Sequence, residues 1–136
     1  MTTLAGAKQL WKAAVPPKVK FFFWQALHGR LWTAERRKRH GHQQDEACRA
    51  CVLCDQLDET TDHLLASCVF TREVWHSQLR RVGRQQLVPL GDSCLSDWWL
   101  HTRASIPKEF RRSFDSLVLL VSWNVWKEQN RRTFEN

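Results

Sequence analysis

Residues 51–68 read CVLCDQLDETTDHLLASC, and this stretch decides how the chain folds. Cys51 and Cys54 are separated by two residues, and His63 and Cys68 follow with four residues between them. Three thiolates and one imidazole form a complete tetrahedral ligand set for Zn²⁺. A gap of two residues lets one tight turn bring both sulfurs onto one metal. The spacing therefore predicts a Zn²⁺ site made by Cys51, Cys54, His63 and Cys68.

Cys48 offers a competing pair with Cys51, again with two residues between them. In such turns the residue after the second cysteine often adopts a left-handed conformation. Asp55 after Cys54 tolerates this conformation, whereas the β-branched Val52 after Cys51 does not. This difference favours Cys51 and Cys54, and a ligand set that uses Cys48 stays as the alternative.

The spacing of the last two ligands restricts the backbone between them. Positions five residues apart point about 140° away from each other on a straight α-helix. The backbone between His63 and Cys68 must therefore loosen, or one ligand must lie at a helix end. Four protein ligands leave no open position for water, so we expect a structural site and not a catalytic one. A redox use of the two-residue cysteine spacing is not favoured, since no βαβ pattern surrounds it.

Patterns typical of catalysis are not visible elsewhere in the sequence. There is no G-x-S-x-G, H-E-x-x-H, Walker loop or paired-carboxylate arrangement. Cys94 is expected to be a plain thiol. The remaining histidines have no cysteine or histidine partner at a suitable spacing, and they are His28, His40, His42, His76 and His101. We therefore expect a domain that is not an enzyme.

The size and composition favour one folded domain. The chain has 136 residues, of which 43% are hydrophobic, and they include 8 Trp and 7 Phe. We expect a helical arm at 1–44, a zinc core at about 48–75 and a C-terminal helical part at 76–136. No apolar run is long enough to span a membrane, and the N-terminus lacks the apolar region of a secretory signal. The odd number of cysteines favours a reducing, intracellular compartment.

The hydrophobic pattern predicts a mostly α-helical fold, with helices at about 4–14, 19–31, 34–40, 62–82 and 105–134. Pro16 and Pro17 should stop the first helix. The second should bury a wide apolar face that includes Phe21 and Trp24. Thr33 suits the N-cap of the third and Gly41 its C′ position. Residues 89–96 read as a loop, Trp98-Trp99 is either a buried pair or a surface anchor, and Phe110 falls on the apolar face of the last helix.

The charge is unevenly distributed. The net charge is +7, and residues 1–44 hold nine Lys and Arg against the single acid Glu35, whereas residues 45–62 hold six acids against one Arg. Basic patches of this kind are typical of nucleic-acid binding, while an acidic zinc loop should stay away from phosphate. A solvated helix face or a nuclear-import signal would give the same basic run, so the nucleus is one expected location. The predicted contacts to RNA or DNA are Arg36, Arg37, Lys38 and Arg39, with Lys18, Lys20 and Arg30.

With these residues in view, the chain resembles the zinc-binding domain found downstream of the reverse transcriptase in plant LINE-type retroelements. The resemblance implies zinc ligation by the four residues chosen above and a role in nucleic-acid handling by a parent polyprotein. It rests on the following segments: Trp11-Lys12, Val15-Pro16-Pro17-Lys18-Val19-Lys20-Phe21-Phe22-Phe23-Trp24, Leu31 and Thr33, Cys51-Val-Leu-Cys54, Glu59-Thr60, His63-Leu64-Leu65, Cys68, Val74-Trp75 and the terminal run from Trp123 to Phe134.

Two features differ from the family pattern. The segment Glu35-Arg36-Arg37-Lys38-Arg39 stands where the family usually has an apolar residue after the threonine. The chain has no Tyr, which usually accompanies the acid pair of a reverse transcriptase palm. We therefore expect a fragment or remnant of a retroelement reading frame that lacks the polymerase. The alternative function is a structural or protein-interaction module that orients other modules of the polyprotein.

Overall fold

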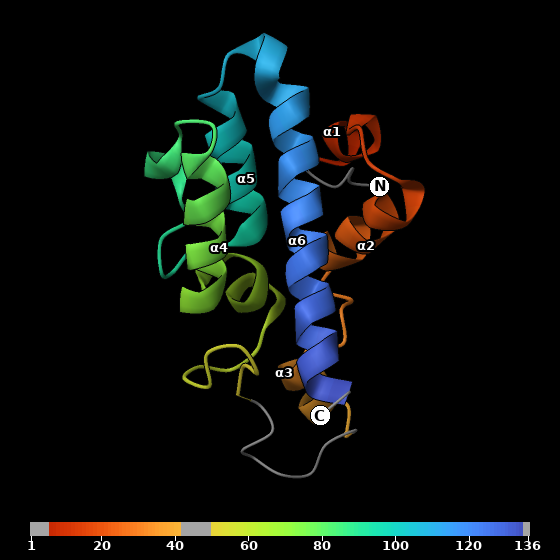
Figure 1. The fold of residues 1–136 in the computed structure, drawn as a ribbon. Helices are drawn as coiled ribbons and strands as arrows, with labels where there is room; N and C mark the ends of the chain where they lie inside the picture. Colours follow the sequence, from red (N-terminus) through yellow and green to blue (C-terminus); the bar gives the residue numbers. More distant parts are fainter. Residues whose placement is uncertain (1–5, 42–49, 135–136) are drawn as a thin grey trace.

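The computed structural model describes residues 6–41 and 50–134, and within these ranges it is mostly helical and has no β-strand (Figure 1). This confirms the predicted fold class. The α-helices are α1 (Ala7–Lys12), α2 (Pro17–Leu27), α3 (Ala34–Arg39), α4 (Val69–Arg80), α5 (Leu95–Ala104) and α6 (Arg111–Phe134). Shorter turns are the π-helix η2 (His63–Ser67) and the 3₁₀ turns η3 (Gln85–Leu87) and η4 (Lys108–Phe110).

Helix α6 is the axis of the fold. In Figure 1 it runs through the middle of the molecule, with α4 and α5 on one side and α1 and α2 on the other. Its 24 residues give it a length of about 36 Å. Its buried apolar residues face both sides and are Phe114, Val118, Leu119, Val121 and Val125. The core therefore forms around α6, and the first and last segments of the chain share it.

Helix α2 packs onto α6 through the face that the sequence predicts. Pro17 occupies the first turn, where its missing N–H costs nothing. Phe22 lies against Trp123 with ring centroids 5.3 Å apart, and Phe23 lies edge-on to Trp99, also at 5.3 Å. The prediction that Phe21 also belongs to the buried face is wrong, because Phe21 is 55% exposed.

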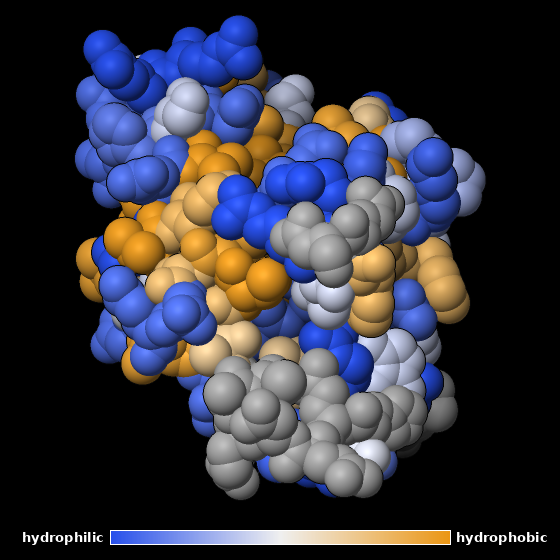
Figure 2. All heavy atoms as spheres, turned by 60° about the horizontal axis from the view of Figure 1, so that its bottom comes forward, coloured by the Kyte–Doolittle hydropathy of each residue, from blue (hydrophilic) through white to orange (hydrophobic). Residues whose placement is uncertain are grey.

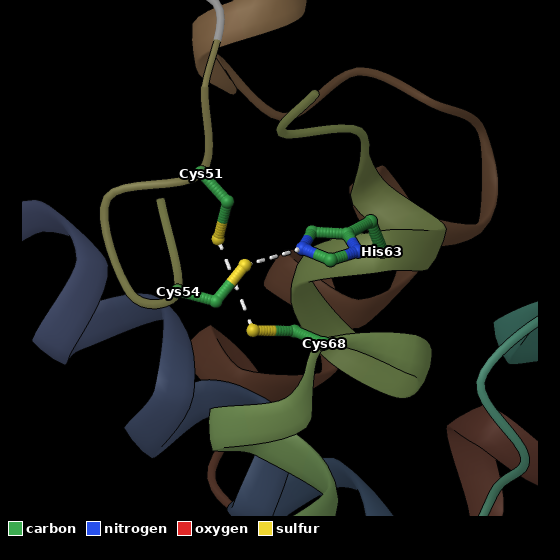
Figure 3. Close-up of side chains that lie close together, drawn as sticks. All are labelled: Cys51, Cys54, His63 and Cys68. Atoms are coloured by element: carbon green, nitrogen blue, oxygen red, sulfur yellow. Dashed lines mark hydrogen bonds between the residues drawn. The ribbon is translucent and has the colours of Figure 1, made fainter. Parts of the chain in front are cut away.

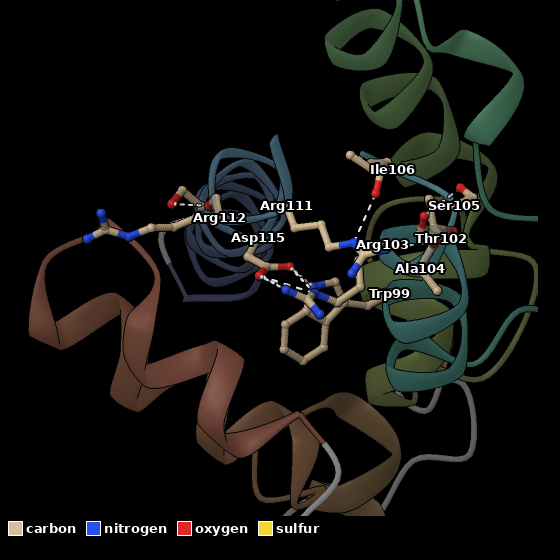
Figure 4. Close-up of polar contacts among 10 residues, drawn as sticks. Trp99, Thr102, Arg103, Ala104, Ser105, Ile106, Arg111, Arg112 and Asp115 are labelled. Atoms are coloured by element: carbon tan, nitrogen blue, oxygen red, sulfur yellow. Dashed lines mark hydrogen bonds and ion pairs between the residues drawn. The ribbon is translucent and has the colours of Figure 1, made fainter. Parts of the chain in front are cut away.

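Helix α5 contains the tryptophan pair and buries part of it. Trp99 has no exposed surface, and its Nε1 donates to Asp115 Oδ1 at 2.8 Å. Arg103 Nε lies 3.0 Å from the same carboxylate oxygen, which forms a partly buried ion pair between α5 and α6 (Figure 4). Trp98 is half-buried and donates to the carbonyl of Leu87. The surface-anchor interpretation is therefore wrong for Trp99.

Several element boundaries differ from the sequence prediction. Helix α2 ends at Leu27, four residues before the expected end of the 19–31 helix, and the loop expected at 89–96 ends where α5 begins at Leu95. The expected helix at 62–82 is interrupted at Cys68, where the backbone is extended. The expected helix at 105–134 begins with the 3₁₀ turn η4, which leaves Phe110 57% exposed and off the apolar face. Helix α1 is shorter than expected. The predicted division into arm, zinc core and C-terminal part stays a prediction.

The caps of α3 are the predicted ones. Thr33 Oγ1 accepts a hydrogen bond from the Arg36 N–H at 3.3 Å, and Gly41 has a φ of 75°, the left-handed conformation of a C′ glycine.

Within the described ranges no helix has both the length and the apolar character needed to cross a bilayer.

Candidate metal centre

The first half of the site is a tight turn from Cys51 to Asp55. The Asp55 N–H donates to the Cys51 carbonyl at 2.7 Å, and Asp55 has a φ of 57°. This is the left-handed conformation that the sequence argument required after Cys54. The Cys51 N–H donates to the Leu57 carbonyl at 2.8 Å, which closes the loop beside an isolated bridge between Ala50 and Asp58.

The second half of the site is the π-helix η2, followed by a break. The Cys68 N–H donates to the His63 carbonyl at 2.7 Å, which is the i to i+5 bond of a π turn. Cys68 itself has φ −58° and ψ 136° and stands before the first residue of α4. Both solutions anticipated from the spacing are therefore used: the backbone widens, and Cys68 lies at a helix end.

The four predicted ligand side chains converge on one point (Figure 3). Their ligand atoms all lie within 4.8 Å of one another. Cys51 Sγ is 3.9 Å from Cys68 Sγ, and Cys54 Sγ is 3.2 Å from His63 Nε2. Tetrahedral bonds of the usual Zn–S and Zn–N lengths place two sulfurs about 3.8 Å apart and a sulfur and a nitrogen about 3.6 Å apart. The observed spacing and the donor types fit a Zn²⁺ ion.

Burial gives this cluster the properties of a structural site. Cys51 and Cys68 have no exposed surface and His63 is 7% exposed, while Cys54 is half-buried. The hydrogen bond between the two buried thiols raises the pKa of Cys51 and lowers the pKa of Cys68, because it favours one thiol beside one thiolate. Burial acts to raise the pKa at both positions, which adds to the shift of Cys51 and opposes that of Cys68. A bound cation would favour the thiolate form of both cysteines.

The Glu59 side chain is not a ligand, but it is hydrogen-bonded to the backbone of the cysteine turn. The side chain has no exposed surface, and its Oε2 accepts the Val52 N–H at 2.9 Å. Thr60, the next residue, accepts the His63 N–H through its hydroxyl at 3.1 Å. Glu59 and Thr60 therefore hold the two halves of the site, one through each side chain.

The same carboxylate connects the site to α3 and α6. Glu59 Oε1 accepts the Ala34 N–H at 2.8 Å and Gln129 Nε2 at 2.6 Å. The Glu59 carbonyl also accepts the Glu35 N–H at 3.2 Å. Sequence reasoning missed this role, since Glu59 looks like one of several acids in an exposed acidic loop. The only signal was its place in the Glu59-Thr60 pair of the resemblance.

The other cysteines and histidines that the structure describes are not brought into the cluster. Among the described residues, the grouped metal-binding side chains are the four named above and do not include Cys94, which contacts Ser96 Oγ at 3.5 Å. His28 lies 2.8 Å from the Trp24 carbonyl through Nδ1. Cys48 and His42 lie outside the described residues, so the alternative ligand set that uses Cys48 stays untested.

The predicted nucleic-acid contacts divide into exposed and buried residues. Arg37 is only 8% exposed, its Nη1 donates to the Trp32 carbonyl at 2.7 Å, and its guanidinium lies over the Phe134 ring. It therefore docks α3 and is poorly placed to meet a phosphate. Lys20 donates to the Trp11 carbonyl at 2.9 Å. The other six cations of the set are exposed or half-buried, and they are Lys18, Lys20, Arg30, Arg36, Lys38 and Arg39.

Comparison with known proteins agrees with this geometry. No curated protein and no solved structure matches the chain. A family model described as zinc-binding in reverse transcriptase matches residues 2–75, which is more than half of the chain and contains all four converging side chains. The chain therefore belongs to the family of zinc-binding domains in reverse transcriptases.

Proposed function

We propose that Cys51, Cys54, His63 and Cys68 hold one Zn²⁺ ion whose role is structural. A four-ligand tetrahedral set leaves no position for water or substrate, so the ion would supply no catalytic chemistry and would instead fix the cysteine turn against η2. The proposal is supported by the convergence of the four ligand atoms. We assign the domain an accessory, non-catalytic role. Metal analysis of purified protein should find one zinc per chain.

We infer further that the domain binds nucleic acid through the basic side of α2 and α3. The observation that carries this proposal is the contact between Arg36 and Arg30, in which the Arg36 guanidinium donates to the Arg30 carbonyl. It brings two cations together on one surface. Within the described residues neither guanidinium has a carboxylate partner at ion-pair distance, so both charges are available to phosphate.

The zinc loop limits where the phosphates would lie. A groove next to Arg36 and Arg39 is also lined by Glu35, Asp58 and Asp62. Near the four cysteine and histidine ligands, Leu57 is 59% and Val69 is 44% exposed. Figure 2, in which the bottom of Figure 1 comes forward, shows hydrophobic surface between hydrophilic regions. Acidic and apolar groups both disfavour phosphate. The sugar-phosphate backbone of the nucleic acid should therefore lie on the α2 side of the domain, where Lys18, Arg30 and Arg36 face it.

Salt dependence tests this proposal. If about four phosphates are neutralised, the log of the affinity should fall with the log of salt concentration with a slope of about −3.6 on duplex DNA or −2.8 on single strands. Changing Lys18, Arg30 and Arg36 together to Gln should flatten the slope by about two units on single strands. Arg37 is left intact because it docks α3.

The matched control removes the same charge elsewhere. Arg80→Gln, Arg81→Gln and Arg84→Gln change three arginines at the end of α4, outside the α2 and α3 surface. This variant should keep most of the wild-type slope. If the two triple variants lose affinity equally, the net charge and not the α2 and α3 surface is responsible. If wild-type protein shows no binding at 50 mM salt, the nucleic-acid proposal is refuted.

The alternative function is a protein-interaction module, and one observation favours it. A mostly apolar groove of about 460 Å³ lies between the end of α4 and the start of α6. Val82 and Phe110 are 62% and 57% exposed beside it, and Arg84 is part of its lining. An amphipathic helix with an apolar face and acidic flanks would fit this groove. Binding of such a helical peptide that is lost in Phe110→Ala, without any nucleic-acid binding, would favour this alternative.

The origin of the chain also remains a proposal. We propose that it derives from a plant LINE-type element and acts beside other modules of a retroelement polyprotein, with the nucleus as its location. The residue segments that resemble such elements support this, together with the membership of the zinc-binding family.

A further inference from the structure

Aromatic side chains lie among the cations on the surface of α2 and α3. They form a continuous row with the two arginines and two histidines, which we call the aromatic strip. Its members, in spatial order, are Phe21, Trp24, His28, Arg30, Arg36, Trp32 and His40.

The first part of the strip follows one face of α2. The rings of Phe21 and Trp24 are nearly parallel, with an interplanar angle of 12° and centroids 6.0 Å apart. Trp24 and His28 follow at 4.2 Å. Residues 21 and 28 are seven positions apart, so this part extends about 10 Å along the helix. Lys18, one turn before Phe21, adds an exposed cation at its start.

The second part of the strip continues onto α3. The Arg30 guanidinium lies over the Trp24 ring at 5.4 Å from its centroid, and the Arg36 guanidinium donates to the Arg30 carbonyl. Arg36 in turn lies over the Trp32 ring at 3.8 Å, and Trp32 meets His40 edge-on at 5.6 Å. His28 and Arg30 therefore both contact Trp24, and from Arg30 onward each member contacts the next.

Most of the strip lies outside the core, although Trp24 is half-buried and packs against it. Phe21 is 55% and Trp32 42% exposed, whereas Phe22 and Phe23, the next residues of α2, are almost completely buried. Intramolecular cation–π contacts stabilise exposed sites by only about 0.5–1 kcal/mol. That gain is small for a surface that keeps large aromatic rings in water. Flat rings that alternate with cations match what nucleobases and phosphates offer together.

We infer that the aromatic strip binds single-stranded nucleic acid by base stacking, with the phosphates held by the neighbouring cations; this inference rests on the proposed nucleic-acid function. In a duplex the bases are stacked on each other and their faces are closed to protein side chains. Unpaired bases stack on aromatic rings and on guanidinium planes. Because every base has such a face, the strip should tolerate many sequences.

The direct test compares strands by fluorescence anisotropy at one fixed salt concentration. Fluorescein-labelled dT12 and rU12 are titrated with zinc-loaded full chain, beside a labelled 12-base-pair duplex. We expect the wild type to bind both single strands more tightly than the duplex. Loss of one stacked base should weaken single-strand binding roughly 5- to 150-fold, so Trp24→Ala and Trp32→Ala should each show a loss in that range.

Four further measurements separate stacking from a disturbed fold or a lost charge. Trp32→Phe should recover most of the affinity, since it restores an aromatic face. Trp32→Ala should keep the salt slope of the wild type, because no cation is removed. Phe110→Ala removes an aromatic of similar exposure from η4, at the end of the molecule away from α3 (Figure 1), and should bind like the wild type. Thermal unfolding of each variant checks that the fold is kept.

The outcomes distinguish this inference from the function on which it rests. If the wild type binds neither single strands nor duplex, both fail. If it binds the duplex as tightly as dT12, and the two Ala variants bind like the wild type, the stacking inference is overturned while phosphate binding stands. A loss in Trp32→Ala that Trp32→Phe does not recover would likewise count against stacking.

Discussion

Replacing Glu59 by Gln would test how the metal centre is held, because Gln keeps the shape and changes one acceptor into a donor. Glu59 accepts three hydrogen bonds in the core: Oε2 from the Val52 N–H and Oε1 from the Ala34 N–H and Gln129 Nε2. A Gln side chain has one acceptor oxygen. Whichever way its amide is turned, either Val52 or Ala34 has its N–H opposite an NH₂ group.

The magnitude follows from this orphaned donor. A buried backbone N–H without an acceptor costs about 1–3 kcal/mol. Turning the Gln129 amide could satisfy its own contact, since Gln129 Oε1 is buried without a partner in the described structure, but it cannot supply an acceptor to the backbone. We therefore expect Glu59→Gln to lower the free energy of unfolding by about 1–3 kcal/mol.

Urea unfolding of the zinc-loaded protein at neutral pH would measure this loss, with an unchanged m-value indicating that the native state is as compact as before. The matched control is Glu128→Gln. Glu128 lies on α6 next to Gln129, but its side chain is 31% exposed and bonded to Arg131 and Arg132. The control should leave the unfolding midpoint nearly unchanged. A loss below 1 kcal/mol in Glu59→Gln would refute the role given to this carboxylate.

The remaining predictions concern the metal and the core. Metal analysis should find that zinc is lost from each of the four ligand variants, Cys51→Ser, Cys54→Ser, His63→Ala and Cys68→Ser, and retained by Cys48→Ser and Cys94→Ser. Structural zinc contributes about 10–16 kcal/mol of apparent binding free energy in small fingers. Chelation of the zinc should therefore unfold the region around 48–75, which hydrogen exchange can show. Phe23→Ala should cost about 3–5 kcal/mol in urea unfolding, since the ring has no exposed surface, while Phe21→Ala should cost under about 1. Asp115→Ala should cost about 3–5 kcal/mol in the same assay, because it leaves Arg103 and the Trp99 N–H without their acceptor.

The ligand positions could be predicted from the sequence because their chemistry is local. Cysteine and histidine at metal-binding spacings, and an Asp where the turn requires a positive φ, are visible within eighteen residues. The structure places Asp55 at a φ of 57° and brings the four ligand atoms together. The periodicity of α2 likewise predicted the burial of Phe22 and Phe23, since an apolar helical face needs a partner surface.

The polar contacts inside the core could not be predicted, because they join residues far apart in sequence. Glu59 meets Gln129 across seventy positions, and Asp115 meets Trp99 across sixteen. In the sequence both acids resemble surface residues. Arg37 was misjudged for a related reason. A basic run on a short helix looks solvated throughout, but one position must face the body of the protein, and here the guanidinium provides that contact.

The dependence of α3 on such contacts links the metal to the aromatic strip. Helix α3 has six residues, far fewer than the roughly 12–15 that an isolated helix needs in water, so tertiary contacts must hold it. Its first N–H groups are bonded to the side chain and the carbonyl of Glu59, and Glu59 also holds the cysteine turn through Val52. If the turn loses its ion and opens, Glu59 loses one partner and α3 loses part of its anchor. The zinc loop, although its acidic side chains disfavour phosphate, would in this way determine where Arg36 and Trp32 lie.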